Sequence, residues 1–354
     1  MKIKKIEFSG FRNLFDFTLT PDSNINILCG ANAQGKTNIA EAIWLFTGAK
    51  SFRGAKDSEM VGFGKEKAEI KMQFVSEGIL RDAKISISNK RRAFLDEKPL
   101  KSAAQLAGNF CAIVFSPNDL GLVKDGPSAR RRFLDIAIGQ LYPLYIELLK
   151  DYTRAVAQRN KIIKDFKNVY GAEEMLDIFE AEIAEKGAKI IEYRKEYCKK
   201  AEPFTAEIYK GISKEREELE FSYISSVDSE NLSEALYKAR KTDMFSGVTS
   251  VGPHRDDLDF KINGISARSF GSQGQKRSIA LSLKLAEAKT IMEIKGEQPV
   301  AILDDVMSEL DPERQEYILN HIKDRQVFIT CCDYSNIKAF EKGKVFNIEA
   351  GRIK

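Results

Sequence analysis

The chain has 354 residues, of which 43% are hydrophobic and 31% are charged. This balance is typical of a folded globular protein and excludes an intrinsically disordered chain. The net charge is only +4, so nucleic-acid binding would require a local basic patch. No apolar run reaches the roughly 20 residues of a membrane span, and no secretory segment follows the basic start. We therefore expect a cytoplasmic protein that does not enter a membrane.

The N-terminal region, from Met1 to about Phe115, has the pattern of short strands and turns. Ile85 and Ile87 alternate with polar residues and lead into a polar turn at 88–91, which predicts a strand. One helix interrupts this region. It is predicted to begin near Lys36, after the strand-like run 25–28, because apolar residues follow at helical spacing.

The middle of the chain, from roughly Gln140 to Arg240, has a helical pattern rich in glutamate and lysine. Residues 141–240 contain 17 basic and 20 acidic side chains, so the segment is close to neutral. A nearly neutral charged helix is typical of an arm with solvated faces, whereas a DNA-binding stripe would carry one sign of charge.

Strand signals return in the C-terminal region, at 300–303, 327–330 and 345–348, with two helical patterns between them. Alternating strands and helices predict an α/β fold with a mostly parallel sheet covered on both faces. The two ends of the chain would complete this sheet. We expect one domain from residues 1–139 and 246–354, and an inserted helical arm from 140–245.

Cysteine and histidine are sparse. The five cysteines show no Cys-x-x-Cys spacing, and only two histidines could join them around a metal. We predict reduced thiols in the core rather than a zinc site. The cysteines are Cys29, Cys111, Cys198, Cys331 and Cys332.

Residues 30–37, GANAQGKT, have the spacing of a phosphate-binding loop between a predicted strand and a predicted helix. Such a loop directs backbone amides at phosphate, and the positive end of the following helix favours an anion. A glycine-rich turn with a surface lysine is the alternative, which the flanking elements disfavour. The nucleotide-binding residues predicted here are Gly30, Ala31, Asn32, Ala33, Gln34, Gly35, Lys36, Thr37 and Asn38.

Within this loop, Lys36 should reach the β- and γ-phosphates of ATP, and the Thr37 hydroxyl should bind Mg²⁺. A second magnesium ligand is predicted at Asp304, where the buried strand 300–303 ends in two acids. Asp305 would lie beside the γ-phosphate and orient the attacking water. A helix-capping acid pair is the alternative, and the presence of the phosphate loop disfavours it.

Ser272 and Gln275 open a predicted helix and have two possible roles. The Ser-x-x-Gln spacing is that of a capping box. The same helix start, with Ser272 and Gly274 exposed, could also meet the γ-phosphate of a nucleotide held by another subunit. Both roles are compatible. Asp311, which is followed by Pro312, is predicted to cap a helix; a role across a subunit interface is implied only by the family resemblance described below.

Five segments together resemble the RecF family of bacterial DNA replication and repair proteins. They extend from near the start to near the end of the chain, and the set is highly specific. The segments are GANAQGKTNIAEAIWLFTGAKSF (30–52), FSPNDLGLVKDGPSARRRFLD (115–135), GPHRDDL (252–258), FGSQGQKR (270–277) and LDDVMSELD (303–311).

The resemblance implies an ABC-type P-loop ATPase head, related to the heads of structural-maintenance-of-chromosomes proteins, with an inserted helical arm. It implies an ATP-dependent homodimer, slow DNA-dependent ATP hydrolysis, and binding to single-stranded, gapped or double-stranded DNA. It also implies association with the nucleoid and help, with RecO and RecR, in loading the RecA recombinase at gaps. None of these properties follows from composition or spacing.

Two features depart from the wider ABC pattern. The acid after the magnesium ligand is Asp305 rather than glutamate, so its reach toward water is shorter by one methylene and hydrolysis should be slow. After Thr330 come Cys331, Cys332 and Asp333, with no histidine to contact the γ-phosphate. Thr330 or a neighbour is the candidate to replace it.

Two basic clusters could contact DNA phosphates if their cations share one face. Surface charge alone would explain either cluster, and the second could instead serve the nucleotide or pack within residues 126–135. The clusters are Lys90, Arg91 and Arg92, and Arg130, Arg131 and Arg132.

A transporter subunit and a clamp that binds ATP without hydrolysing it are the competing functions. The transporter is disfavoured by the arm, and the clamp by the acid pair.

Overall fold

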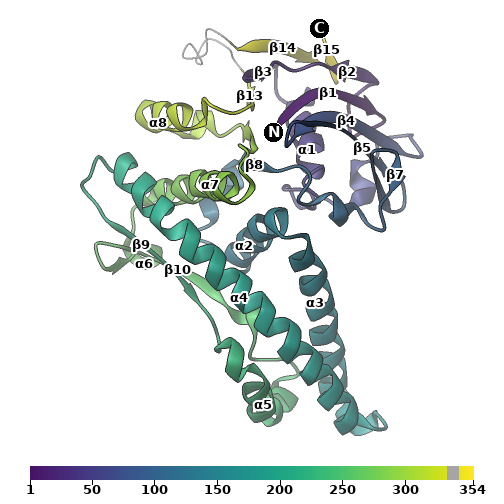
Figure 1. Ribbon diagram of the computed structural model, residues 1–354, viewed down its shortest axis with the longest axis vertical. Helices are drawn as coiled ribbons and strands as arrows, with labels where there is room; N and C mark the ends of the chain where they lie inside the picture. Colours follow the sequence, from purple (N-terminus) through teal and green to yellow (C-terminus); the bar gives the residue numbers. More distant parts are fainter. Residues whose placement is uncertain (333–342) are drawn as a thin grey trace.

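A computed structural model describes residues 1–332 and 343–354 of the chain. Two sheets and the helices that cover them form one end of the molecule, and long helices extend from it as an arm (Figure 1). Short 3-10 helices connect the larger elements. They are η1 (Asp57–Met60), η2 (Ala103–Leu106), η3 (Pro117–Gly121), η4 (Phe166–Asn168), η5 (Ser229–Asn231), η6 (Pro253–Arg255) and η7 (Met307–Glu309).

The central sheet has the order β15-β14-β3-β13-β12-β8, and all neighbours from β14 to β8 are parallel. Alternate residues of its strands enter two different cores. Val300 and Ile302 face one core, whereas Ala301 and Leu303 face the other, so both faces are buried. The strands are β3 (Ile25–Cys29), β8 (Ala112–Phe115), β12 (Val300–Asp304), β13 (Val327–Cys331), β14 (Lys344–Glu349) and β15 (Arg352–Ile353).

A second, antiparallel sheet is built from the N-terminal region, in the order β2-β1-β4-β5-β6-β7. Ile6 and Phe8 point from β1 into a core that also contains Ile39 and Ile43 of α1 (Lys36–Leu45). The two sheets therefore enclose the helix that follows the phosphate loop. The strands are β1 (Lys2–Ser9), β2 (Phe17–Leu19), β4 (Ala68–Ser76), β5 (Ile79–Ile87), β6 (Arg91–Leu95) and β7 (Lys98–Pro99).

Helices cover the other face of the central sheet and continue into the arm (Figure 1). Among them, α7 packs between the sheet and the arm helix α4. No helix in the described ranges is both long and apolar enough to span a membrane. The helices are α2 (Pro127–Leu141), α3 (Pro143–Lys164), α4 (Ala172–Ile212), α5 (Leu232–Ser246), α6 (Ala267–Phe270), α7 (Gln273–Lys295) and α8 (Pro312–Ile322).

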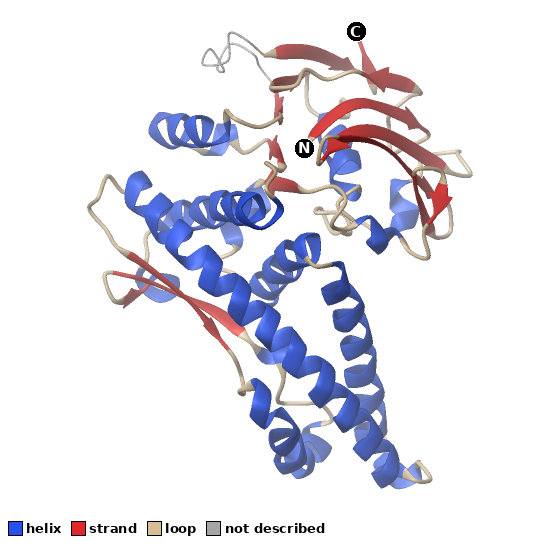
Figure 2. Cartoon of the chain, in the orientation of Figure 1, coloured by secondary structure: helices blue, strands red, loops and turns tan. Residues whose placement is uncertain are grey.

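A small antiparallel sheet runs along α4 (Figure 2) and has the order β11-β10-β9. Its strands are β9 (Leu219–Ile224), β10 (Asp257–Ile262) and β11 (Ile265–Ser266). One strand lies before the predicted boundary at 245/246 and two lie after it, so β10 and β11 sit beside the arm in space. The domain boundaries at 139/140 and 245/246 stay a prediction.

The predicted α/β fold is confirmed: the three C-terminal strand signals became β12, β13 and β14, and the N-terminal helix became α1. The helical pattern between β12 and β13 is α8. The pattern predicted between β13 and β14 lies outside the described residues. The cysteines are free thiols, and residues 1–332 and 343–354 contain no group of three His, Cys, Asp or Glu side chains that could hold a metal.

Candidate nucleotide-binding site

The loop between β3 and α1 has a shape that only its glycines permit. Gly30 has φ +154°, and a Cβ there would lie 2.2 Å from the carbonyl oxygen of Ile348. Gly35 has φ +109°, and a Cβ there would lie 2.7 Å from Leu14 Cδ2. The loop thus curls back at both ends and delivers the N-terminus of α1 to its centre, which is the arrangement that favours a phosphate.

Lys36, the first residue of α1, closes the loop from inside. Its Nζ donates to the carbonyl oxygens of Gly30, at 2.6 Å, and Ala31, at 2.8 Å. The side chain is 8% exposed, so the ammonium is held within the loop and not free in solvent. A bound polyphosphate would offer this cation stronger, charged acceptors in place of the two carbonyls.

Asp304 lies at the end of β12 and meets two hydroxyl groups. Thr37 Oγ1 and Thr330 Oγ1 each donate to Asp304 Oδ1 at 2.9 Å. Burial raises the pKa of Asp304 above its ordinary value, and these two hydrogen bonds oppose the rise. The parallel register that pairs Asp304 with Thr330 therefore brings a carboxylate to the mouth of the phosphate loop.

Asp305 follows in an unusual backbone conformation, with φ +54°. Its amide donates to Thr330 Oγ1 at 2.9 Å, and its side chain is exposed and lines the same cavity as Lys36. The positive φ turns the chain at the strand end so that the two successive acids face different surroundings. Thr330 thus contacts both Asp304 and Asp305. Asp333 lies outside the described residues.

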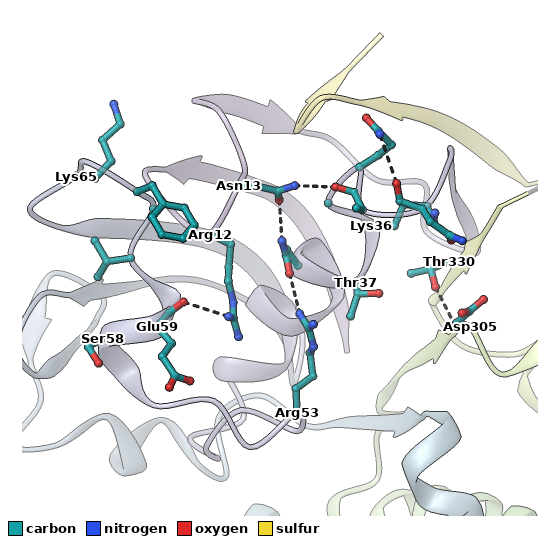
Figure 3. Close-up of a pocket in the computed structure, with 18 of the residues that line it drawn as sticks. Arg12, Asn13, Lys36, Thr37, Arg53, Ser58, Glu59, Lys65, Asp305 and Thr330 are labelled. Carbon is teal, nitrogen blue, oxygen red and sulfur yellow. Dashed lines mark hydrogen bonds between the residues drawn. The ribbon is translucent and has the colours of Figure 1, made fainter.

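An open cavity of about 830 Å³ extends from these groups along the phosphate loop. Figure 3 shows Asp305 and Thr330 at one end and residues of the N-terminal sheet region at the other. All of the predicted loop residues from Asn32 to Asn38 line it.

The sequence had not indicated three polar residues of this cavity, Arg12, Asn13 and Arg53 (Figure 3). Asn13 Nδ2 donates to the carbonyl of Ala33 at 2.9 Å, and Asn38 Nδ2 donates to Asn13 Oδ1 at 2.7 Å. Arg53 Nη1 donates to Asn38 Oδ1 at 3.0 Å. These bonds brace the loop from outside. No sequence signal had pointed to Arg12 and Asn13, which lie in the connection that follows β1 (Lys2–Ser9).

Arg12 is itself held in place by a buried acid. Its Nε and Nη2 donate to the two carboxylate oxygens of Glu41, each at 2.9 Å. Glu41 is fully buried on α1 and also accepts from Ser51 Oγ at 2.5 Å. The two-pronged pairing fixes the plane of the guanidinium at the cavity wall.

The start of α7 has the predicted capping box. Gln275 N donates to Ser272 Oγ at 3.2 Å, and Ser272 N donates to Gln275 Oε1 at 2.7 Å. Ser272 is exposed and Gly274 is half-buried. The structural role is therefore present, and the exposed helix start remains open to the second role.

Arg314, on α8, links this helix start to Asp311. Its Nη2 donates to the carbonyl of Gly274 at 3.2 Å, its Nε donates to Ser278 Oγ at 3.1 Å, and its Nη1 pairs with the Asp311 carboxylate. Asp311 caps α8 by accepting from the backbone of Arg314 at 3.0 Å. The pKa of Asp311 is lowered, because these hydrogen bonds outweigh the effect of partial burial. Sequence reasoning had missed Arg314.

Within one chain these residues lie apart from the phosphate loop. Ser272, Gly274, Gln275 and Arg314 line a separate cavity of about 380 Å³. In the described ranges, no residue lines both this cavity and the one at Lys36. The structure therefore gathers the predicted site residues into two groups on different parts of one chain.

Comparison with known proteins agrees with this geometry. Residues 2–352 match the model of the RecF/RecN/SMC N terminal domain. A DNA replication and repair protein RecF from Clostridium perfringens is 38% identical, and the alignment covers 100% of this chain and 99% of the relative. One from Clostridium acetobutylicum is 40% identical with the same coverage. The chain belongs to the RecF family of DNA replication and repair proteins.

Solved structures of the family support the same assignment. A recombination mediator protein RecF described with ATP in the RecFOR pathway superposes with a TM-score of 0.92 and 35% identity, covering 100% of this chain and 97% of the other. An Smc head domain from Pyrococcus furiosus, at 17% identity and a TM-score of 0.55, shares the fold. The expected ABC-type ATPase head of the RecF family is thus confirmed.

The basic clusters of this RecF-family chain are not uniformly available to DNA. Arg130 is 1% exposed and pairs with Asp257 through Nε at 2.6 Å and Nη2 at 2.9 Å, which corrects its assignment as a DNA contact. Arg91 is only 9% exposed and donates to the carbonyl of Ala49 at 2.8 Å, so it too is held within the fold.

The other members of the two clusters are accessible to different degrees. Lys90 is exposed in the turn between β5 and β6, and Arg92 is exposed near the start of β6. Arg131 is half-buried and donates to the carbonyl of Asp256 at 2.7 Å. Arg132 is exposed, and its Nη2 donates to the carbonyl of Ser51 at 2.8 Å. Lys90 and Arg92 are therefore the stronger candidates for phosphate contacts.

Proposed function

We propose that the chain binds ATP with Mg²⁺ in the cavity at residues 30–38 and hydrolyses it slowly in a DNA-dependent manner. The observation that carries the proposal is the hydrogen bond that Thr37 Oγ1 donates to Asp304 Oδ1 at the mouth of the phosphate loop. A hydroxyl and a carboxylate at this place are the two protein ligands that a nucleotide-bound Mg²⁺ uses. The family members described with ATP support the choice of nucleotide.

The residues present suit a Mg²⁺ ion that is bound together with a nucleotide. They do not suit a cation whose ligands all come from the protein. Thr37 and Asp304 supply hard oxygen ligands, which Mg²⁺ prefers, but they supply only two. Phosphate oxygens and water would complete the coordination. When bound, the ion neutralises charge on the phosphates, and Thr37 would exchange its hydrogen bond to Asp304 for a metal contact.

Two side chains, Lys36 and Asp305, would act in the reaction itself. Lys36 would move from the loop carbonyls to the β- and γ-phosphates, where its charge stabilises the transition state. Asp305 would orient the attacking water, with its backbone fixed by Thr330. Because the aspartate side chain is short and points from a left-handed turn, we expect turnover to be slow.

Two chains would share each nucleotide. One chain supplies Lys36, Thr37 and Asp304, and the other supplies the helix start at Ser272, Gly274 and Gln275 together with Asp311. The separation of the two groups within one chain supports this arrangement, because a head-to-tail pair with two-fold symmetry would close both sites. ATP would favour the dimer because only ATP offers a γ-phosphate to the second helix start.

The closed homodimer would then hold DNA through exposed cations such as Lys90 and Arg92. Partnership with RecO and RecR, and help in loading the RecA recombinase at gaps, are proposed from family membership. The RecFOR pathway named for the solved relatives supports these partners.

The test compares Lys36→Ala with Lys238→Ala, an exposed lysine of the arm. Calorimetry should show that Lys36→Ala loses ATP binding and that the control keeps it. Sedimentation of the wild type with ATP, ADP and DNA, separately and together, should show dimers only with ATP. Phosphate release should rise with DNA. ATP binding and dimerisation without any phosphate release would favour a non-hydrolysing clamp instead.

A further inference from the structure

The two ends of the cavity differ, and the difference indicates which end would hold the terminal phosphate of a nucleotide and which would hold the base. Its acidic end, at Asp305 and Thr330, lies beside Lys36, so the terminal phosphate belongs there. The phosphate loop then leads away from this end. The far wall is formed by Ser58 and Glu59 of η1 and by the loop 61–65, Val61-Gly62-Phe63-Gly64-Lys65. A nucleotide whose triphosphate lies along residues 30–37 directs its base toward this wall.

The loop 61–65 is anchored through its backbone. Gly62 N donates to the carbonyl of Gly10 at 2.8 Å, and Lys65 N donates to the carbonyl of Gly62 at 3.0 Å. A Cβ at Gly62 would lie 2.7 Å from the carbonyl oxygen of Arg12, so only glycine allows this close approach. The loop is therefore fixed against the end of β1 rather than loosely attached.

Phe63 stands between these anchors with its ring fully exposed. It belongs to neither of the two cores of the head and, in the part of the chain that the structure describes, has no aromatic partner. An exposed large apolar side chain is ordinary on a surface, but this one lines the nucleotide cavity at the end away from Asp305. Its ring offers a free face where a base is expected.

We infer that Phe63 stacks against the nucleobase and gives the site a preference for purine over pyrimidine nucleoside triphosphates. This inference rests on the proposed nucleotide site and adds a specificity residue to it. Stacking on an aromatic ring tolerates any base, but a purine covers more of the ring than a pyrimidine. Phe63 would therefore not separate ATP from GTP, and it would favour both over CTP and UTP.

The experiment measures binding of ATP, CTP and inorganic tripolyphosphate to the wild type and to Phe63→Ala. Tripolyphosphate reports the phosphate loop without a base. Loss of one stacked base should weaken ATP binding of Phe63→Ala by roughly 5- to 100-fold, with tripolyphosphate binding unchanged. CTP binding should fall less, so the ratio of ATP to CTP affinity should shrink.

Two further variants sharpen the result. Phe63→Trp should keep the affinity for ATP. ATP should quench the fluorescence of the introduced tryptophan, whereas tripolyphosphate should not. Phe245→Ala removes an exposed phenylalanine on the arm and should change nothing. Unchanged ATP binding in Phe63→Ala would overturn the inference, and so would an equal loss for ATP and tripolyphosphate. A wild type that binds neither ligand would instead overturn the nucleotide site itself.

Discussion

Replacing Asp304 with asparagine should separate the nucleotide site from the stability of the fold. Asparagine keeps the shape and one oxygen to accept from Thr37 and Thr330, but it carries no charge. The Asp304 carboxylate is 5% exposed and its pKa is raised by burial, so its charged form costs stability in the nucleotide-free protein. At pH 7 we therefore expect Asp304→Asn to melt slightly above the wild type without nucleotide.

The raised pKa of Asp304 also predicts how the unfolding free energies of the two proteins depend on pH. With a raised pKa in the folded state, the wild type loses unfolding free energy as pH rises from the ordinary value of 3.8 through the folded pKa. Asp304→Asn is free of this decrease. The variant should therefore have the higher unfolding free energy at neutral pH, and this difference should disappear below pH 3.8, the ordinary pKa of the carboxyl group.

Nucleotide should reverse the order of the two proteins. A ligand at 100 times its Kd adds about 2.7 kcal/mol to the unfolding free energy. At about 2.1 cal/mol/K per residue, 354 residues give an unfolding entropy of about 0.7 kcal/mol/K, and hence a rise in Tm of about 4 °C. Removing one charged interaction, worth about 1.5–3 kcal/mol, weakens binding by roughly 10- to 100-fold and leaves a rise of about 0.5–2 °C.

Scanning fluorimetry with and without Mg-ATP provides the measurement, at equal nucleotide concentration for both proteins. Asp305→Asn is the matched control, because its side chain is exposed and does not contact Thr37. It should keep the wild-type rise in Tm and lose phosphate release. The reasoning would be refuted by an Asp304→Asn protein that shows the full wild-type rise, or one that melts several degrees lower without nucleotide.

Three further predictions concern other parts of the molecule. Ser272→Arg should keep the ATP affinity of the monomer and abolish ATP-dependent dimers in sedimentation; normal dimers would contradict a shared site. Replacing Lys90 and Arg92 with alanine should flatten the plot of log DNA affinity against log salt by about 0.9 for each phosphate that is no longer neutralised, and an unchanged slope would remove both residues from the interface. Arg159→Met should lower the unfolding free energy by about 3–5 kcal/mol in urea titrations, because Arg159 is fully buried and pairs with acids of α4 and α5. Arg154→Met, 66% exposed, should change it by less than about 0.5 kcal/mol, and equal decreases for the two variants would contradict this account.

Local sequence was sufficient for the phosphate loop and for the carboxylate opposite it. The glycines and Lys36 act within one turn of backbone, so their spacing carries their geometry. Asp304 ends a run of apolar residues that only a buried strand explains. Arg12 and Arg53 were not predictable in this way, because the cavity wall they form is assembled from segments that meet only when the two sheets enclose α1.

The arginine cluster at 130–132 shows a second limit. Successive residues of a helix point about 100° apart, so three adjacent cations cannot face one surface. On α2 this places Arg130 inside, against Asp257, and leaves Arg132 outside. The charge run was visible in the sequence, but the side of the helix that packs against β10 was not.

The length of α4 determines how far a small rotation at one end of the helix would displace the other end. This helix has 41 residues, and at 1.5 Å per residue it is about 60 Å long. One end packs on α7, the helix that begins just after Ser272, and the other end reaches the far end of the arm (Figure 1). For a rod of that length, a rotation of about 5° where α4 packs on α7 displaces the distal end by about 5 Å. A change at α7 too small to disturb the core would thus be enlarged, at the far end of the arm, to the width of a whole side chain.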